Sequence, residues 1–233
     1  MTKQNDVQAD KDFVLGIYQA LLKEYGRQEW WPGDSVFEIM VGAILTQNTQ
    51  WFNVKKAIKS LKEENLLEPR KMYLASEKRL ASLIVQAGYY NIKAKRLKNF
   101  LEYLMEKELD FYSMRREPIE SLREELLEIN GIGPETADSI LLYALNKRTF
   151  VVDAYTRRLF SRLNPKWDWM KRITYDELKA FFEKLLPSDL QIYNEFHALI
   201  VMHSKEVCKS KPICEDCLLK KTCSESSQTL LNR

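Results

Sequence analysis

Glycine and proline are scarce in this sequence, and cysteine is confined to one short segment. The 233 residues contain seven glycines and seven prolines, with no low-complexity linker among them. The apolar runs, such as VFEIMVGAIL, are too short to span a bilayer. The N-terminus MTKQNDVQAD is polar and acidic, unlike a secretory signal or a transit peptide. These absences argue against a membrane protein, and a cytoplasmic location is the expectation.

Sustained alternation of polar and apolar residues, the mark of a half-buried strand, is also missing. Apolar residues instead recur at helical spacing, as at Phe13, Ile17 and Leu21. Capping boxes, in which a hydroxyl and a carboxylate satisfy the first amides of a helix, are predicted at Ser35 with Glu38, Ser121 with Glu124 and Thr174 with Glu177. The sequence therefore predicts an all-α protein.

Charge is nearly balanced, at a net +3, but its distribution is uneven. Basic residues gather at Lys93, Lys95, Arg96 and Lys98, at Arg157, Arg158 and Arg162, and at Lys205, Lys209, Lys211, Lys220 and Lys221. Each run taken alone reads as a solvated helix face. Several of them together also fit a surface that binds phosphates.

A glycine-rich turn lies between two apolar runs in LLEINGIGPETADSILLYAL. Gly131 and Gly133 permit backbone conformations closed to other residues, and Pro134 suits the first position of a helix. The pattern predicts a helix, a tight turn and a second helix, whose outward amides could bind a phosphate. An ordinary helix–helix connection would have the same glycines.

This hairpin resembles the helix-hairpin-helix of the endonuclease III superfamily of DNA glycosylases. In that superfamily an aspartate follows the hairpin after a short extended segment, and Asp153 in FVVDAYTRR matches it. The resemblance implies DNA contacts at Gly131, Ile132, Gly133 and Thr136. It also implies a monovalent cation, Na⁺ or K⁺, held by the backbone carbonyls of Leu127, Ile129 and Ile132.

Asp153 immediately precedes the amphipathic run DAYTRRLFSRL, so it could simply be the N-cap of a helix. The dipole of that helix would favour the ionised carboxylate. Such an anion could also stabilise a sugar that becomes an oxocarbenium ion and orient the attacking water. Because both the hairpin and the spacing match, a catalytic role is the prediction.

All four cysteines occur in CKSKPICEDCLLKKTC, at Cys208, Cys214, Cys217 and Cys223. Their crowding favours a metal over disulfides, and the irregular spacing, with only one CxxC pair, favours an iron–sulfur cluster over zinc. The segment resembles the 4Fe–4S loop of the endonuclease III family, although the first gap is five residues here and usually six there. Zinc and free thiols stay as alternatives.

Glu135 occupies the hairpin position at which bifunctional members of the family have a lysine nucleophile. A carboxylate cannot form an imine, so strand cleavage by β-elimination is not expected. Glu135 could add negative potential beside the base, or it could be an exposed acid at a helix start. Lys147, in LNKRTF, is predicted to lie on the wrong side of the second helix to replace it.

Two further stretches resemble the endonuclease-III-like 3-methyladenine DNA glycosylases more specifically. In AILTQNTQWFNV, Gln47 takes the place of a residue that fills the gap left by a flipped base, and Asn48 lies beside it. The resemblance assigns the base pocket to Trp30, Trp31, Pro32 and Trp51. Packing in the core is the alternative for these tryptophans. Stacking of a cationic methylated base on indole would select it over normal bases.

The resemblance spans residues 12–225 and implies two helical lobes, with a cleft between them for the flipped nucleotide. A six-helix barrel, residues 35–137, would end in the hairpin. Residues 1–34 and 138–233 would form a second helical lobe with the cluster loop at 208–223. The predicted function is a monofunctional glycosylase that removes alkylated purines, 3-methyladenine first, from double-stranded DNA. The protein is expected to be a monomer associated with the nucleoid. Its product, an abasic site, would then be processed by an AP endonuclease.

Two rival functions stay open. One is a glycosylase with AP lyase activity on oxidised bases, which the missing hairpin lysine disfavours. The other is a non-enzymatic iron–sulfur protein that binds DNA, which would need the cysteines and the basic runs but not Asp153.

Overall fold

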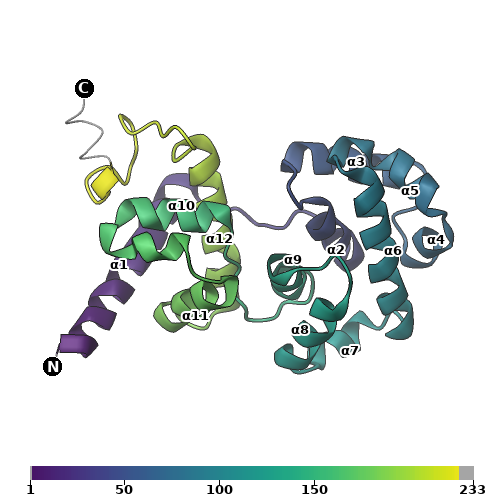
Figure 1. Ribbon diagram of the computed structural model, residues 1–233, viewed down its shortest axis with the longest axis horizontal. Coiled ribbons are helices and arrows are strands. Elements are labelled where there is room, and N and C mark those ends of the chain that lie inside the picture. Colours follow the sequence, from purple (N-terminus) through teal and green to yellow (C-terminus); the bar gives the residue numbers. More distant parts are fainter. Residues whose placement is uncertain (1, 226–233) are drawn as a thin grey trace. The chain divides into compact units, whose positions relative to one another are not determined.

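The computed structural model describes the backbone of residues 2–225 and the side chains of residues 7–225, and this part of the chain is helical without strands (Figure 1). The all-α prediction is confirmed. The chain divides into two compact units, Met1–Trp30 with Arg148–Arg233 (unit 1) and Trp31–Lys147 (unit 2). None of the described helices has the length and apolar character needed to cross a membrane.

Unit 2 is built around α2, a helix whose residues are almost all buried. Its sequence VFEIMVGAIL is apolar on nearly every face, as expected of a core helix. Helices α3, α6 and α9 pack around it (Figure 1). The helices of unit 2 are α2 (Val36–Leu45), α3 (Trp51–Glu63), α4 (Pro69–Leu74), α5 (Glu77–Leu83), η1 (Val85–Ala87), α6 (Tyr90–Glu106), α7 (Phe111–Arg116), α8 (Ile119–Glu128), α9 (Pro134–Ser139) and η2 (Ile140–Ala144).

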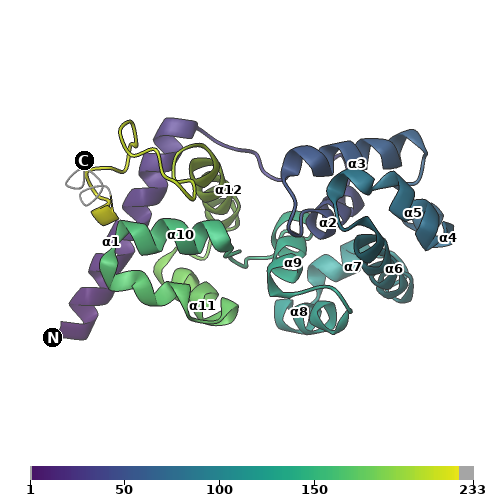
Figure 2. The ribbon, with the colours of Figure 1, turned by 45° about the horizontal axis from the view of Figure 1, so that its top comes forward.

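Unit 1 has an aromatic core, in which Phe160 contacts Phe182 at 4.8 Å between ring centroids. Helix α12 packs against both α1 and α10 (Figure 2). The helices of unit 1 are α1 (Thr2–Tyr25), α10 (Ala154–Leu163), η3 (Pro165–Lys171), α11 (Tyr175–Leu185) and α12 (Leu190–Glu206).

The division between the units differs from the boundaries drawn from sequence, 35 and 137. Residues after 137 continue from α9 into η2, a stretch of π-helix whose side chains are buried against α2. Because the second hairpin helix and its extension share the core of unit 2, the division follows Lys147.

The three predicted capping boxes have different outcomes. Thr174 and Glu177 form the full reciprocal box at the start of α11. Ser35 caps α2 by accepting from the amide of Glu38, but the Glu38 carboxylate accepts from the amide of Asp34, one residue further back. The box predicted at Ser121 is wrong, because α8 already begins at Ile119 and Ser121 lies inside its first turn.

Candidate functional site

The hairpin turn in unit 2 requires glycine at one of its two glycine positions. Gly131 has a φ of +99°, and a Cβ there would overlap the side chain of Arg96, which lies across the turn. Gly133 does not adopt a backbone conformation that is closed to other residues, contrary to the prediction. It is the N-cap of α9 with an extended backbone (φ −95°, ψ 176°), and a Cβ would meet nothing within 4 Å. The backbone fold therefore does not require glycine at 133.

Gln47 is bound directly to this hairpin. Its amide nitrogen donates to the carbonyl of Gly131 at 3.0 Å and to the hydroxyl of Thr136 at 2.9 Å. Its amide oxygen accepts from the guanidinium of Arg96. Three of the predicted DNA-contacting residues are thus gathered in unit 2, and Arg96, which the sequence analysis placed only in a basic run, joins them. Asn48, next to Gln47, is exposed in a left-handed conformation (φ 51°).

A buried lysine, Lys93, binds the residues on either side of Gln47. Lys93 is 1% exposed, and its ammonium donates to the carbonyls of Leu45 and Ala87, both at 2.8 Å, and to the hydroxyl of Thr49 at 2.6 Å. Burial, with a smaller contribution from Arg96, lowers the pKa of Lys93 to about 8. Lys93 therefore links segments inside unit 2 through hydrogen bonds, and it is not part of a phosphate-binding surface.

The remaining hairpin positions divide by exposure. Glu135 is exposed in the first turn of α9, whereas Ile132 is 4% exposed and Thr136 is 7% exposed. Lys147 is occupied elsewhere, because its ammonium donates to the backbone carbonyls of Arg115 and Glu117. Burial lowers the pKa of Lys147.

Two of the four residues predicted for the base pocket come together in unit 2. The rings of Trp31 and Trp51 meet edge to face at 5.2 Å, and Tyr143 lies 5.4 Å from Trp31. The indole of Trp31 rests on Gly42, where a Cβ would come within 3.0 Å of it. These three rings are called the aromatic cluster below. Tyr143 was missed because SILLYAL reads as a plain apolar run.

The other two pocket candidates lie outside the aromatic cluster. Pro32 is exposed. Trp30 is the last residue before the division and belongs to unit 1, where it is half-buried. The segment leading to Trp30 is held by Glu195 of α12, whose carboxylate accepts from the amides of Gln28 at 2.7 Å and Glu29 at 3.2 Å.

Asp153 is the N-cap of α10 in unit 1, with its side chain 10% exposed. Its Oδ1 accepts from the amide of Thr156 at 2.7 Å and from the hydroxyl at 2.9 Å. Its Oδ2 lies 3.5 Å from Nε2 of His197 on α12. Burial alone would raise the pKa of the Asp153 carboxyl, but the contacts with His197 and Thr156 outweigh it and lower that pKa. The carboxylate is therefore ionised at neutral pH.

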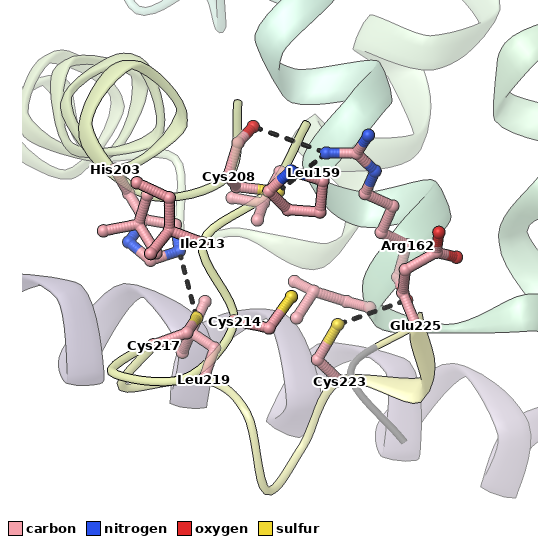
Figure 3. A pocket seen from close by; sticks show the side chains of 13 residues that line it. Leu159, Arg162, His203, Cys208, Ile213, Cys214, Cys217, Leu219, Cys223 and Glu225 are labelled. Atoms are coloured by element: carbon pink, nitrogen blue, oxygen red, sulfur yellow. Dashed lines mark hydrogen bonds between the residues drawn. The ribbon is translucent and has the colours of Figure 1, made fainter. Parts of the chain in front are cut away.

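The four cysteines, all from the loop after α12, line one pocket (Figure 3). Burial raises the pKa of the Cys217 thiol, and the proximity of the other three thiols raises it further. Yet within residues 2–225 no three cysteine, histidine or acidic side chains converge as ligands of one metal ion must. The metal assignment made from the cysteine spacing therefore stays a prediction.

The arginine run of α10 supports this loop and the core, which corrects the view of it as a phosphate-binding cluster or a solvated face. Arg162 donates to the carbonyls of Lys209 at 2.6 Å and Ser210 at 2.9 Å, and to the sulfur of Cys208 at 3.4 Å. Arg158 donates to the carbonyl of Cys208, and Arg157 donates to backbone carbonyls of the segment before α11.

The chain belongs to the HhH-GPD superfamily of base excision DNA repair proteins, whose family model matches residues 41–188.

Among curated proteins, a candidate DNA repair glycosylase of Methanocaldococcus jannaschii is 51% identical over 91% of this chain and 96% of its own length. Endonuclease III of Thermotoga maritima is 32% identical over 80% of this chain and 82% of its own.

Two solved structures extend the comparison. A crystal structure of the H. pylori 3-methyladenine DNA glycosylase, bound to 1,N6-ethenoadenine, is 32% identical with a TM-score of 0.68, and the match covers 86% of this chain and 97% of that one. A non-covalent complex of endonuclease III with DNA has a TM-score of 0.79 over 95% of this chain and 98% of that one. Its identity is 20%, so it establishes the likeness of the fold.

Proposed function

We propose that this glycosylase is monofunctional and hydrolyses the N-glycosidic bond of alkylated purines in double-stranded DNA, with 3-methyladenine as the first substrate. The observation that carries the proposal is the carboxylate at Glu135, exposed at the start of the second hairpin helix. Members of the superfamily that also cleave the strand use a lysine there. The 32% identity with a 3-methyladenine glycosylase supports the choice of lesion.

The aromatic cluster supports the selection of a charged base. A purine methylated at a ring nitrogen is cationic, which weakens its bond to the sugar before any enzyme acts. Contact between that cation and the face of an indole is worth about 2 kcal/mol where water is excluded. Trp31 and Trp51, which meet edge to face and are both half-buried, are proposed to supply such faces in unit 2. Trp30 and Pro32 are proposed to complete the pocket on the bound duplex.

Asp153 is the proposed catalytic carboxylate. As the bond from C1′ to the base nitrogen breaks, its electron pair leaves with the base and the sugar becomes an oxocarbenium ion. An ionised carboxylate facing C1′ stabilises that cation and can accept a proton from the water that adds to it. The products are the free base and an abasic site, the substrate of an AP endonuclease.

The hairpin is the proposed grip on the DNA backbone. Amides of the turn after Ile132 would bind a phosphate, with a monovalent cation on the carbonyls of Leu127, Ile129 and Ile132. The carbonyl of Ile129 already accepts from the amide of Ile132 at 2.9 Å, which shapes the turn. Gln47 and Asn48 are proposed to enter the duplex where the damaged base has left it. The protein would act as a monomer.

The four cysteines are proposed to hold a 4Fe–4S cluster, because all four line one pocket and their sequence contains only one CxxC pair. Bound there, the cluster would supply structural cross-linking of the loop after α12. Iron and acid-labile sulfide, at about four of each per chain, would support this assignment. Stoichiometric zinc in freshly purified protein would overturn it.

The function is tested with duplexes that each carry one alkylated, oxidised or deaminated base. Free base is measured by chromatography, and strand breaks are counted with and without later alkali. We expect release of 3-methyladenine, with breaks only after alkali. Breaks without alkali, together with an adduct trapped by borohydride on an abasic duplex, would favour the endonuclease III-like lyase instead. Binding of damaged duplex without release of any base would favour a non-enzymatic DNA-binding protein.

A further inference from the structure

The two oxygens of the Asp153 carboxylate have different partners. Oδ1 alone accepts both hydrogen bonds from Thr156, so it accounts for the whole helix cap. Oδ2 is not needed for the cap, and it faces Nε2 of His197 at 3.5 Å. The contact joins the start of α10 to the middle of α12.

His197 is an unusual residue for its place on α12. It is 7% exposed, and the neighbouring Phe196, Leu199 and Ile200 are all fully buried apolar side chains. Burying an imidazole in such surroundings has a free-energy cost that an apolar side chain would avoid. The imidazole is aimed at the carboxylate proposed to do the chemistry, and buried ionisable groups of this kind are concentrated at functional sites.

We propose that His197 is a positioning residue that holds Oδ2 of Asp153, so that the carboxylate keeps one orientation toward the sugar. The proposal rests on the proposed function of Asp153 and adds a second residue to it. A carboxylate fixed only through Oδ1 could still rotate about that attachment. An imidazole packed against Oδ2 at 3.5 Å restricts this freedom, and catalysis by a fixed charge depends on such preorganisation.

The same contact affects protonation. Without His197, the burial of Asp153 would be opposed by fewer favourable contacts, and the pKa of its carboxyl would rise. The other groups that feel this carboxylate are Tyr155 on α10 and Lys205 on α12. Both would remain in place when His197 is replaced. A change in the acidic limb, the part of the pH–rate profile where the rate falls at low pH, would therefore report on His197 itself.

The experiment compares His197→Phe, His197→Gln and a matched control, Tyr193→Phe. Glutamine keeps an N–H donor that cannot take up a proton at neutral pH, whereas phenylalanine removes the donor. Tyr193 is 2% exposed on the same helix, one turn earlier, and its ring packs on Phe150. Replacing it removes a buried hydroxyl from α12 without changing Asp153 or His197.

The readouts are duplex affinity, the single-turnover rate of base release from pH 5 to 9, and the titration of Asp153 by carboxyl ¹³C NMR, assigned with Asp153→Asn. For His197→Phe we expect wild-type affinity, a rate about tenfold lower, as for the loss of one hydrogen bond to a charge, and an acidic limb at higher pH. His197→Gln should restore most of the rate, and Tyr193→Phe should behave as wild type.

An unchanged rate and acidic limb in His197→Phe would overturn the proposal, as would an equal loss in Tyr193→Phe. If the wild-type protein releases no base from any duplex, the proposed function fails, and the NMR titration still decides this inference. A raised pKa of Asp153 in His197→Phe would support it, and an unchanged one would overturn it.

Discussion

Asp153→Asn separates the two roles of this side chain, because asparagine can cap a helix but carries no charge. The amide oxygen can accept the two bonds from Thr156 that Oδ1 accepts now, at 2.7 and 2.9 Å. Asparagine and aspartate are about equally good N-caps, so the free energy of unfolding should change by less than about 1 kcal/mol. Asp153→Ala, which loses the cap, should lose about 1 kcal/mol.

The catalytic effect of the same change should be far larger. Removing a preorganised group that stabilises transition-state charge typically slows a reaction by about 10²–10³-fold, or roughly 3–4 kcal/mol. Single-turnover base release should therefore fall at least a hundredfold in Asp153→Asn, while duplex affinity and the thermal midpoint stay near those of wild type. A rate within a factor of about ten of wild type would refute the reasoning, since it would mean that the charge at 153 does not face the sugar.

Three further predictions concern unit 2. Gly131→Ala should destabilise the protein by about 1–3 kcal/mol in urea unfolding, because its φ is +99° and Arg96 fills the space. Gly133→Ala should stay within about 0.5 kcal/mol, because the lower entropy of the unfolded chain offsets the poorer N-cap. Equal effects would contradict the turn geometry. The pKa of Lys93 is about 8 in the folded protein and 10.5 for an ordinary lysine, so folding disfavours the protonated form. The unfolding free energy of wild type, measured relative to that of Lys93→Met, should therefore rise as the pH increases from 8 to 10.5. A difference that does not change with pH would contradict this. Glu135→Lys should form a borohydride-trapped adduct on an abasic duplex that wild type does not form; its absence in a folded variant would contradict the hairpin assignment.

Signals that act over three or four residues predicted the fold well. Helical periodicity gave the all-α class, and the box at Thr174 and Glu177 formed as expected. Asp153 was recognised as an N-cap before its catalytic role was considered, and it is one. The failure at Ser121 has a local cause as well. Pro118 can precede a helix without donating a hydrogen bond, so α8 starts three residues earlier than a cap at Ser121 would give.

Most contacts that shape the candidate site could not be predicted from the sequence, because they join residues far apart in the chain. Arg96 and Gln47 are 49 residues apart. Tyr143 reaches Trp31 from the end of the hairpin extension. No local pattern distinguishes the Arg158 side chain that binds the carbonyl of Cys208 from one that would extend into solvent. A charge run shows where cations are, and only the fold shows which of them are already bound to backbone oxygens.

Buried charges recur where irregular segments of the site have to be fixed. Regular helices satisfy their own amides and carbonyls, but a segment between helices must find partners elsewhere. In unit 2 the ammonium of Lys93 binds the carbonyl of Leu45, just before the segment with Gln47, and the carbonyl of Ala87. In unit 1 the carboxylate of Glu195 binds the amides that lead to Trp30. An apolar side chain at either position would fill the space and leave those backbone groups unsatisfied. The apolar pattern that builds the two cores therefore cannot by itself build the site, and the charged residues within it are part of the functional design.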